Sequence, residues 1–310
     1  MKVFGPVPSR RLGRSLGINN IPPKVCSYAC VYCQLGRTIK REASPRAFFD
    51  PEEIWREAQA KINKTGRGAI DYLTFVADGE PTLDVNLGRE IELLKSSGIK
   101  VAVITNASLL WREEVRARLL VADLVSLKVD AVREETWHRL NRPCQELSLP
   151  LILEGMLAFA RTYPGKLLTE TMLIGNVNDS PEQIMEIADF LARLNPARAC
   201  LAIPIRPPAM SWVRLPEARV TNEAYQIIQQ RVARVEYLTG AEENTFTFTG
   251  NLEEELLSIV SVHPLRKEAV RELLRQAEAS WAVVQKLIAQ KQLLELEYEK
   301  ETFYVAGQYF

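Results

Sequence analysis

The chain of 310 residues is long enough for one large domain, or for one large and one small domain. Apolar residues make up 47% of it, and 39 basic residues balance 39 acidic ones, which gives no support for a protein that coats a polyanion. It has no apolar run of membrane-spanning length, and residues 1–11 lack the apolar core of a signal peptide, so we expect a cytoplasmic protein without membrane contact.

Short β-rich runs alternate with helical stretches over most of the chain. The predicted strands are Ser15–Asn19, Asp71–Ala77, Lys100–Thr105, Leu124–Asp130, Lys166–Ile174 and Ala199–Ile205. The predicted helices between them are Pro51–Lys64, Leu87–Ser97, Ser108–Val121, Leu151–Tyr163 and Pro181–Leu194. This alternation predicts an α/β fold with a parallel sheet. Because an eight-unit barrel needs about 250 residues, a partial (β/α)6 TIM-type barrel or an open doubly wound sheet fits better.

One predicted strand carries polar residues where the others are apolar. In Leu124–Asp130, the side chains of Ser126, Lys128 and Asp130 share one face at a period of two. A packed interior does not accept such groups without partners, whereas an interior filled by a ligand does. The alternative is an internal ion pair between the lysine and the aspartate at the rim of the sheet.

The last part of the chain has a different pattern. A proline-rich loop, Pro204–Arg219, precedes a predicted helix at Thr221–Leu238 and a linker near 240–250, in which Thr245–Thr249 alternates like a short extended segment. Three helices are then predicted at Leu252–Val260, Leu265–Gln276 and Ser280–Gln290, with a hairpin of Leu293–Tyr298 and Thr302–Ala306. The order predicts a winged helix-turn-helix module at 250–310, after a barrel domain at 1–240.

The charge of this predicted module favours one of two roles. Residues 250–310 contain seven lysines and arginines against ten aspartates and glutamates, a net charge of −3. Because phosphate contacts dominate affinity for nucleic acid, a DNA-binding module is expected to be basic. We therefore expect protein docking, dimerisation or substrate presentation rather than DNA binding.

Three cysteines form the strongest chemical motif, since Cys26, Cys30 and Cys33 are spaced C-x3-C-x2-C in one loop. Three thiolates are one ligand short of a closed metal site, and an iron–sulfur cluster held in this way keeps one iron open. Structural zinc usually takes four Cys or His ligands, and the two histidines, His138 and His263, read as ordinary surface or capping residues. An odd total of five cysteines argues against a disulfide framework.

The cysteine loop resembles that of the radical S-adenosylmethionine (SAM) superfamily, in which an aromatic residue, here Tyr32, precedes the last cysteine. The resemblance implies that Cys26, Cys30 and Cys33 hold a 4Fe–4S cluster whose fourth iron binds SAM. It also implies that an electron, supplied by a donor such as flavodoxin or ferredoxin, cleaves SAM to a 5′-deoxyadenosyl radical that abstracts hydrogen from a substrate.

Residues at the predicted strand ends extend this resemblance over roughly residues 15–205. The segment Gly79-Glu80-Pro81 is similar to one that binds the SAM amino group through its backbone in the family. Other positions that the resemblance assigns to SAM are Thr105 and Asn106, Ser126 and Lys128 near the ribose and carboxylate, and Asn176 and Asn178 near the adenine. Asn178 and Asp179 also suit a turn and a helix cap before Pro181. These positions follow strands of a parallel sheet, where α/β folds bind ligands.

A finer placement and the substrate residues are less sharply indicated. The segments 4–13, 30–36 and 205–208 resemble Fe–S oxidoreductases related to the wybutosine tRNA-modifying enzymes, although the second cysteine cluster of archaeal members is absent from the sequence. The substrate remains open, and RNA modification is one alternative. Another is an iron–sulfur regulator that binds DNA through the winged helix.

Several further side chains are candidates for the substrate side of the site. Arg10, Arg11, Arg14 and Arg206 are candidates to bind a phosphate or carboxylate, with surface charge as the alternative. Cys144 is a candidate hydrogen-atom donor, although a passive role is the simpler interpretation. Cys200 lies in an apolar run and is expected in the core.

Overall fold

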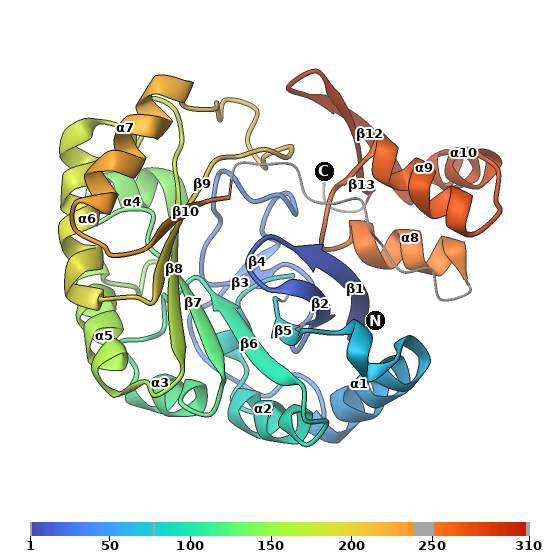
Figure 1. Ribbon diagram of the computed structural model, residues 1–310, viewed down its shortest axis with the longest axis horizontal. Coiled ribbons are helices and arrows are strands. Elements are labelled where there is room, and N and C mark those ends of the chain that lie inside the picture. Colours follow the sequence, from blue (N-terminus) through green and yellow to red (C-terminus); the bar gives the residue numbers. More distant parts are fainter. Residues whose placement is uncertain (1, 77, 239–250, 308–310) are drawn as a thin grey trace.

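The computed structural model describes residues 2–76, 78–238 and 251–307 (Figure 1). Its main sheet has eight strands in the order β1-β2-β5-β6-β7-β8-β9-β10. Neighbours from β2 to β10 pair in parallel, and β1 pairs antiparallel with β2. The strands are β1 (Val3–Ser9), β2 (Gly13–Ile18), β5 (Tyr72–Phe75), β6 (Lys100–Thr105), β7 (Leu124–Lys128), β8 (Lys166–Met172), β9 (Arg198–Ala202) and β10 (Val235–Tyr237).

Seven α-helices accompany this sheet in the described part of residues 2–238, together with the short η1 (Arg67–Ala69) and η2 (Pro81–Leu83). They are α1 (Pro51–Thr65), α2 (Leu87–Lys95), α3 (Glu113–Leu119), α4 (Glu134–Asn141), α5 (Leu149–Thr162), α6 (Pro181–Leu194) and α7 (Ala218–Gln229). Figure 1 shows them on the outer side of a curved sheet whose two edges, β1 and β10, are not neighbours. The α/β class is confirmed, and the mixed sheet is consistent with a partial barrel.

Local sequence explains where several helices begin. The side chain of Asp50 accepts a hydrogen bond from the backbone N–H of Glu52, and Pro51 occupies the first position of α1. Ser180 accepts from the N–H of Gln183 in the same way, and α6 has the bounds that the sequence predicted. The helices bury one face against the sheet, and a single large core of aliphatic and aromatic residues lies between the two.

Some predicted elements differ from the structure. The predicted helix 221–238 is wrong in its second half, because α7 ends at Gln229 and β10 adds a further parallel strand beside β9. The predicted helix 108–121 begins with turns, and only α3 within it is helical. Strand β1, helix α4 and the small parallel pair β3 (Val25–Cys26) and β4 (Lys40–Arg41) were not predicted.

The C-terminal part contains the three predicted helices and the predicted hairpin. They are α8 (Leu252–Val260), α9 (Lys267–Gln276) and α10 (Ala282–Ala289), and the sheet runs β11 (Leu265–Arg266), β13 (Glu301–Ala306), β12 (Leu293–Tyr298). Both residues of the hairpin turn have positive φ, 49° at Glu299 and 65° at Lys300, as a two-residue type I′ turn requires. The winged-helix assignment and the boundaries 1–240 and 250–310 stay predictions, and the predicted extended segment 245–249 lies outside the described residues.

This C-terminal unit, residues 251–307, packs against the first strand of the chain. Phe4 and Val7 of β1 are buried in the same apolar cluster as residues of α8, α9 and α10. Figure 1 shows the unit beside β1, next to the side of the barrel where the sheet does not close. None of the described helices is both long and apolar enough to cross a membrane.

Candidate active site

A cavity of about 300 Å³ lies at the carboxyl ends of the parallel strands. Its walls come from the β1–β2 hairpin, the cysteine loop, the ends of β5 to β9 and two later segments of the chain. The chemically active residues of the lining are Arg10, Arg11, Lys24, Cys26, Cys30, Tyr32, Cys33, Gln34, Asp78, Gly79, Lys128, Glu170, Arg206 and His263. The three cysteines thus converge with side chains from both ends of the chain at the place where α/β folds bind ligands.

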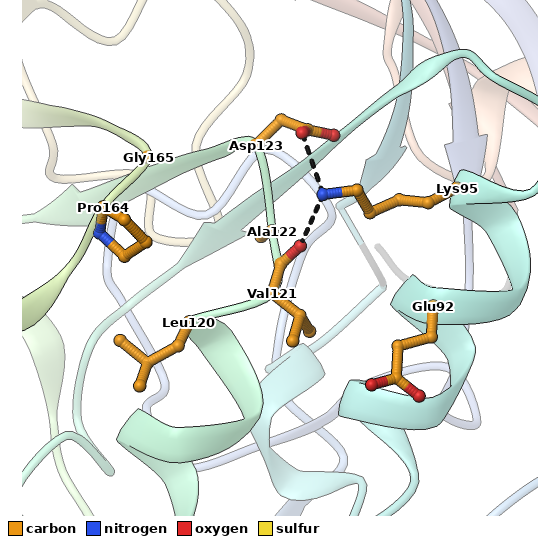
Figure 2. A pocket seen from close by; sticks show the side chains of 8 residues that line it. All are labelled: Glu92, Lys95, Leu120, Val121, Ala122, Asp123, Pro164 and Gly165. Carbon is orange, nitrogen blue, oxygen red and sulfur yellow. Dashed lines mark hydrogen bonds and ion pairs between the residues drawn. The ribbon is translucent and has the colours of Figure 1, made fainter.

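A second hollow, of about 530 Å³, lies at the opposite ends of the strands (Figure 2). An ion pair joins Lys95 Nζ to Asp123 Oδ1 at 3.0 Å, and the same ammonium donates to the carbonyl of Val121 at 3.0 Å. Asp123 also accepts from the N–H of Val101 at 2.8 Å. These contacts join α2 to the starts of β6 and β7, so the charged groups described here have a structural role.

The cysteine loop is a series of turns fixed by backbone bonds and by one lysine. The N–H of Cys33 bonds to the carbonyl of Cys30 at 3.1 Å, and the N–H of Gly36 bonds to that of Cys33 at 3.2 Å. The buried ammonium of Lys24 donates to the carbonyls of Leu35 at 2.7 Å and Gly36 at 2.9 Å. Lys24 therefore fixes the end of the loop while its Nζ lies 3.8 Å from the Cys33 sulfur.

Two asparagine side chains contact the cysteine sulfurs. Asn106 Nδ2 lies 3.5 Å from Cys26 Sγ, and Asn141 Nδ2 lies 3.5 Å from Cys30 Sγ. Burial raises the pKa of Cys26 and raises that of Cys30 to about 12, so these thiols keep their protons until a cation displaces them. Amide donors beside sulfur stabilise the thiolate that such a cation requires.

The donor set fits an iron–sulfur cluster better than one metal ion. In the described residues no three His, Cys, Asp or Glu side chains are arranged to hold a metal ion. A 4Fe–4S cluster does not require the three thiolates to meet at one ion, because each thiolate binds a separate iron. All three cysteines line one cavity, and amide donors contact two of them, as cluster ligands require.

Gly79 lines the cavity next to the cysteine loop. A Cβ atom at this position would lie 1.8 Å from the carbonyl oxygen of Val25, so only glycine allows the two backbones to approach. The approach is fixed by two bonds, from Lys24 N–H to the Asp78 carbonyl at 2.8 Å and from Glu80 N–H to the Val25 carbonyl at 3.1 Å. The Gly79-Glu80-Pro81 segment and the cysteine loop therefore form one structural unit.

The Glu80 carboxylate is buried and points away from the cavity. One oxygen accepts from Thr82 N–H at 3.0 Å, from Thr82 Oγ1 and from Thr105 Oγ1, and the other accepts from Asn106 N–H at 2.8 Å. Burial raises the pKa of Glu80, and the hydrogen bonds oppose that rise. Glu80, Pro81, Thr105 and Asn106 lie outside the main cavity lining, and they position Gly79 and the Asn106 amide that reaches Cys26.

Lys128 lines the cavity within a network of charges inside the barrel. Its Nζ is 2.9 Å from Glu170 Oε1 and 3.6 Å from Asp130 Oδ1, and it lies 4.8 Å from the centre of the Tyr32 ring. Arg11 pairs with the other oxygen of Glu170, and Tyr32 donates its hydroxyl to Asp130. Burial lowers the pKa of Lys128. The internal ion pair expected as the alternative is present, and it borders the cavity rather than a solvent-exposed rim.

The remaining predicted SAM positions lie around this network. Ser126 is buried, and its hydroxyl has no hydrogen-bond partner among the described residues. Asn176 is exposed in a turn with a φ of 59°. Asn178 is fully buried, accepts from Ile174 N–H at 2.8 Å, and donates to the carbonyls of Asp130 at 2.9 Å and Met172 at 2.8 Å. Asn178 therefore joins the ends of β7 and β8 instead of lining the cavity.

The predicted substrate residues divide into two groups. Arg10, Arg11 and Arg206 line the cavity, whereas Arg14 forms an exposed pair with Asp71. Cys144 is buried in the large apolar core and lies outside the described lining of the cavity, and its role as a hydrogen-atom donor stays a prediction. Cys200 is buried, as expected.

Sequence reasoning gave several residues of the site no role, and it expected His263 to be an ordinary surface or capping residue. Lys24, Asn141, Glu170 and His263 belong to the cavity or contact its cysteines. Glu170 lies between Thr169 and Thr171, so its strand lacks the alternation of polar and apolar residues found around Lys128. The available signal was a charged residue within a strand that the sequence predicts to be buried. Lys24 and His263 lie in turns, for which no periodicity exists, and Asn141 is the last residue of α4, a short helix that was not predicted.

Comparison with known proteins agrees with this geometry. Residues 20–191 match the family model described as the radical SAM superfamily. The chain is 47% identical to a UPF0026 protein of Methanocaldococcus jannaschii over 304 residues, which cover 97% of this chain and 95% of that protein. The chain belongs to the radical SAM superfamily. Members of this superfamily bind a 4Fe–4S cluster and SAM, and these are the cofactors of this chain.

Solved structures support the radical SAM fold. SuiB of Streptococcus suis bound to SAM has a TM-score of 0.53 and 16% identity over 71% of this chain and 49% of that one. A radical SAM methyltransferase of Sphaerobacter thermophilus has a TM-score of 0.52 and 15% identity over 73% of this chain and 66% of that one. The chain spans about half the length of SuiB, and at these identities the similarity concerns the fold alone. Membership in the radical SAM superfamily implies an enzyme.

Proposed function

We propose that this radical SAM enzyme reductively cleaves SAM and uses the resulting 5′-deoxyadenosyl radical to abstract hydrogen from a substrate. The observation that carries the proposal is the convergence of three cysteines and Gly79 on one cavity at the strand ends. When bound, the cluster and SAM supply the electron transfer and the radical, and the protein supplies binding, orientation and exclusion of water. The electron donor is proposed to be a flavodoxin or a ferredoxin, and the compartment the cytoplasm.

The proposed ligands follow from the contacts around the cavity. Cys26, Cys30 and Cys33 would hold the cluster, with the amides of Asn106 and Asn141 beside two of the sulfurs. The backbone at Gly79, held open by the absence of a side chain, would bind the SAM amino group.

The other proposed SAM residues divide into direct and positioning groups. Lys128 lines the cavity and has the charge to bind the SAM carboxylate. Ser126 lies two residues earlier on the same face of β7, and its hydroxyl has no hydrogen-bond partner among the described residues. Glu80, Pro81 and Thr105 would position the segment that binds the amino group. Asn178 would act on the adenine side by fixing the end of β8, with Asn176 in the adjoining turn.

Anaerobic reconstitution tests the proposal. The purified chain is loaded with iron and sulfide, reduced in the presence of SAM, and assayed for 5′-deoxyadenosine by liquid chromatography. Cys33→Ser is expected to abolish the product and to lower the iron content, whereas Cys200→Ala, which removes a thiol outside the proposed ligand set, is expected to retain both. Absence of 5′-deoxyadenosine from a fully loaded wild-type chain contradicts the proposal.

The relation to the wybutosine tRNA-modifying enzymes, and RNA as a substrate, stay secondary predictions. For residues 250–310, a winged helix that docks protein is proposed over a DNA-binding regulator, because the segment is acidic. Salt-dependent, sequence-selective DNA binding that changes with cluster loading would instead support the regulator.

A further inference from the structure

The two asparagines that contact cysteine sulfurs come from different parts of the fold. Asn106 directly follows β6, and Asn141 is the last residue of α4. Their Nδ2 atoms lie 3.5 Å from Cys26 Sγ and 3.5 Å from Cys30 Sγ, respectively. Two of the three proposed cluster ligands therefore each have a side-chain amide of their own.

Asn106 is held by bonds from every polar group that it carries. Its backbone N–H donates to Glu80 at 2.8 Å, and its Oδ1 accepts from the N–H of Ser108 at 2.9 Å. Its Nδ2 donates to Ser27 Oγ at 2.9 Å. Because an amide nitrogen carries two protons, one serves Ser27 and the second is available to the sulfur of Cys26.

Asn141 is held by the backbone of the cysteine loop. Its carbonyl accepts from the N–H of Ala29 at 2.9 Å, and the carbonyl of Leu140 accepts from that of Val31 at 2.9 Å. These two bonds lie on either side of Cys30 in the sequence. The end of α4 therefore fixes both the loop that carries this sulfur and the amide that reaches it.

The amide of Asn141 is shared among more acceptors than that of Asn106. Besides Cys30 Sγ, its Nδ2 lies 3.0 Å from Asp130 Oδ2 and 3.2 Å from the hydroxyl of Tyr32. Two protons thus serve three acceptors, one of which is a carboxylate. The hydrogen bond to Cys30 is therefore expected to be weaker than the one from Asn106 to Cys26.

Donors at these positions act on the electron that an iron–sulfur cluster receives. One-electron reduction makes the cluster and its thiolates more negative by one charge, and no bond is formed or broken. An N–H group that points at a thiolate sulfur stabilises the reduced state more than the oxidised one, which is how hydrogen bonds to sulfur raise a reduction potential. Since both amides are already oriented by other bonds, this stabilisation costs no reorganisation.

We propose that the side-chain amides of Asn106 and Asn141 raise the reduction potential of the cluster by donating hydrogen bonds to its thiolates, and that Asn106 has the larger effect. This inference rests on the proposed radical SAM function, because it requires a cluster on the three cysteines. In this role the two asparagines are positioning residues that act through the sulfurs. They make reduction by a one-electron protein donor easier.

A redox titration of the cluster-loaded full chain without SAM tests the inference. The cluster is reduced stepwise with dithionite in the presence of mediators, and the reduced form is measured by electron paramagnetic resonance. Asn106→Leu keeps the branching of the side chain without a donor. It is expected to lower the ratio of reduced to oxidised cluster at a given potential about tenfold, a shift of about 59 mV for one electron. Asn141→Leu is expected to shift the midpoint potential less, in the same direction.

Two further variants separate this role from a purely structural one. Asn106→Asp keeps the acceptor for the N–H of Ser108 but replaces the donor near the sulfur by a carboxylate oxygen. We expect it to lower the midpoint potential more than Asn106→Leu does, whereas a structural role predicts the smaller effect for the aspartate. Asn222→Leu, at an exposed position of α7 outside the described cavity lining, is the matched control and leaves the potential unchanged.

The outcomes distinguish this inference from the proposed function. If both cavity leucine variants have the midpoint potential of Asn222→Leu, the inference is wrong even where the wild type forms 5′-deoxyadenosine. If the potentials shift as expected and no 5′-deoxyadenosine forms after SAM is added, the radical SAM reaction is contradicted and the role of the amides stands. Iron content and circular dichroism establish loading and folding. If neither leucine variant retains a cluster, Asn106→Asp decides, and an unchanged potential in that variant overturns the inference.

Discussion

Two buried carboxyl groups beneath the Gly79-Glu80-Pro81 segment predict a pH-dependent stability. Asp84 and Glu90 are both fully buried, and they interact with one another. Asn20 Nδ2 donates to Glu90 Oε2 at 3.0 Å and to the Pro81 carbonyl at 3.2 Å, so this group supports the segment proposed to bind SAM. Burial raises the pKa of each carboxyl. The neighbouring charge of Asp84 raises the pKa of Glu90 further, whereas the hydrogen bond with Glu90 opposes the rise at Asp84.

The sign of the effect follows from proton linkage. The folded chain keeps a proton on Glu90 at pH values where the unfolded chain has lost it. The stabilisation from this proton is complete below the pKa of Glu90 in the unfolded chain. It is lost as the pH rises through the pKa of Glu90 in the folded chain. While the folded state holds one extra proton, the unfolding free energy falls by about 1.4 kcal/mol per pH unit. Between about pH 5 and about pH 7 the contribution of Glu90 therefore falls by roughly 2–3 kcal/mol.

The substitution Glu90→Gln removes this titration while keeping an acceptor for Asn20. We expect the variant to gain roughly 2–3 kcal/mol of unfolding free energy relative to wild type between about pH 5 and about pH 7. Urea denaturation at each pH measures the difference. Glu92→Gln, at an exposed position of the same helix, is the control for a lost surface carboxylate. A difference between Glu90→Gln and wild type that stays constant over this pH range refutes the reasoning.

Two further predictions concern the segment above this pair. Gly79→Ala places a Cβ 1.8 Å from the Val25 carbonyl oxygen. We therefore expect a lower melting temperature and a reduced iron content after reconstitution. An unchanged iron content would contradict the close approach of the two backbones. Glu80→Ala leaves the buried N–H of Thr82 and the half-buried N–H of Asn106 without their acceptor, so we expect a loss of roughly 2–5 kcal/mol in urea denaturation. A loss below about 1 kcal/mol would show that these groups find other partners.

The sequence predicted much of the barrel because local signals and long-range packing agree there. Asp50-Pro51 and Ser180-Pro181 combine a capping side chain with a proline at the first helical position, and both helices begin where predicted. The predicted secondary structure is wrong where the local sequence pattern is too short to distinguish a helix from a strand. Strand β10 has three residues and follows α7 closely, so its identity depends on pairing with β9, which no local signal reveals.

In the candidate site, too, features with a local sequence signal were predicted, and features that depend on long-range contacts were not. The cysteine spacing and the polar face of β7 indicated the cavity, since each is a pattern that can be recognised within one short segment. The roles of Glu80 and Asn178 were harder to predict, because a buried carboxylate and a buried amide each serve either a ligand or the backbone. Their oxygens and nitrogens bond to neighbouring strand ends here, so their proposed effect on SAM is exerted through the backbone that they position.

The open side of the barrel links these observations to the proposed chemistry. The sheet ends at β1 and at β10, so the strands alone leave the interior accessible between those edges. A carbon-centred radical requires a site that excludes water and competing hydrogen donors. The C-terminal unit packs on Phe4 and Val7 of β1 and contacts the cysteine loop and the segment after β9. Removing a contact such as Tyr298 to Pro204 is therefore predicted to change substrate binding as well as stability, although Tyr298 lies outside the cavity lining.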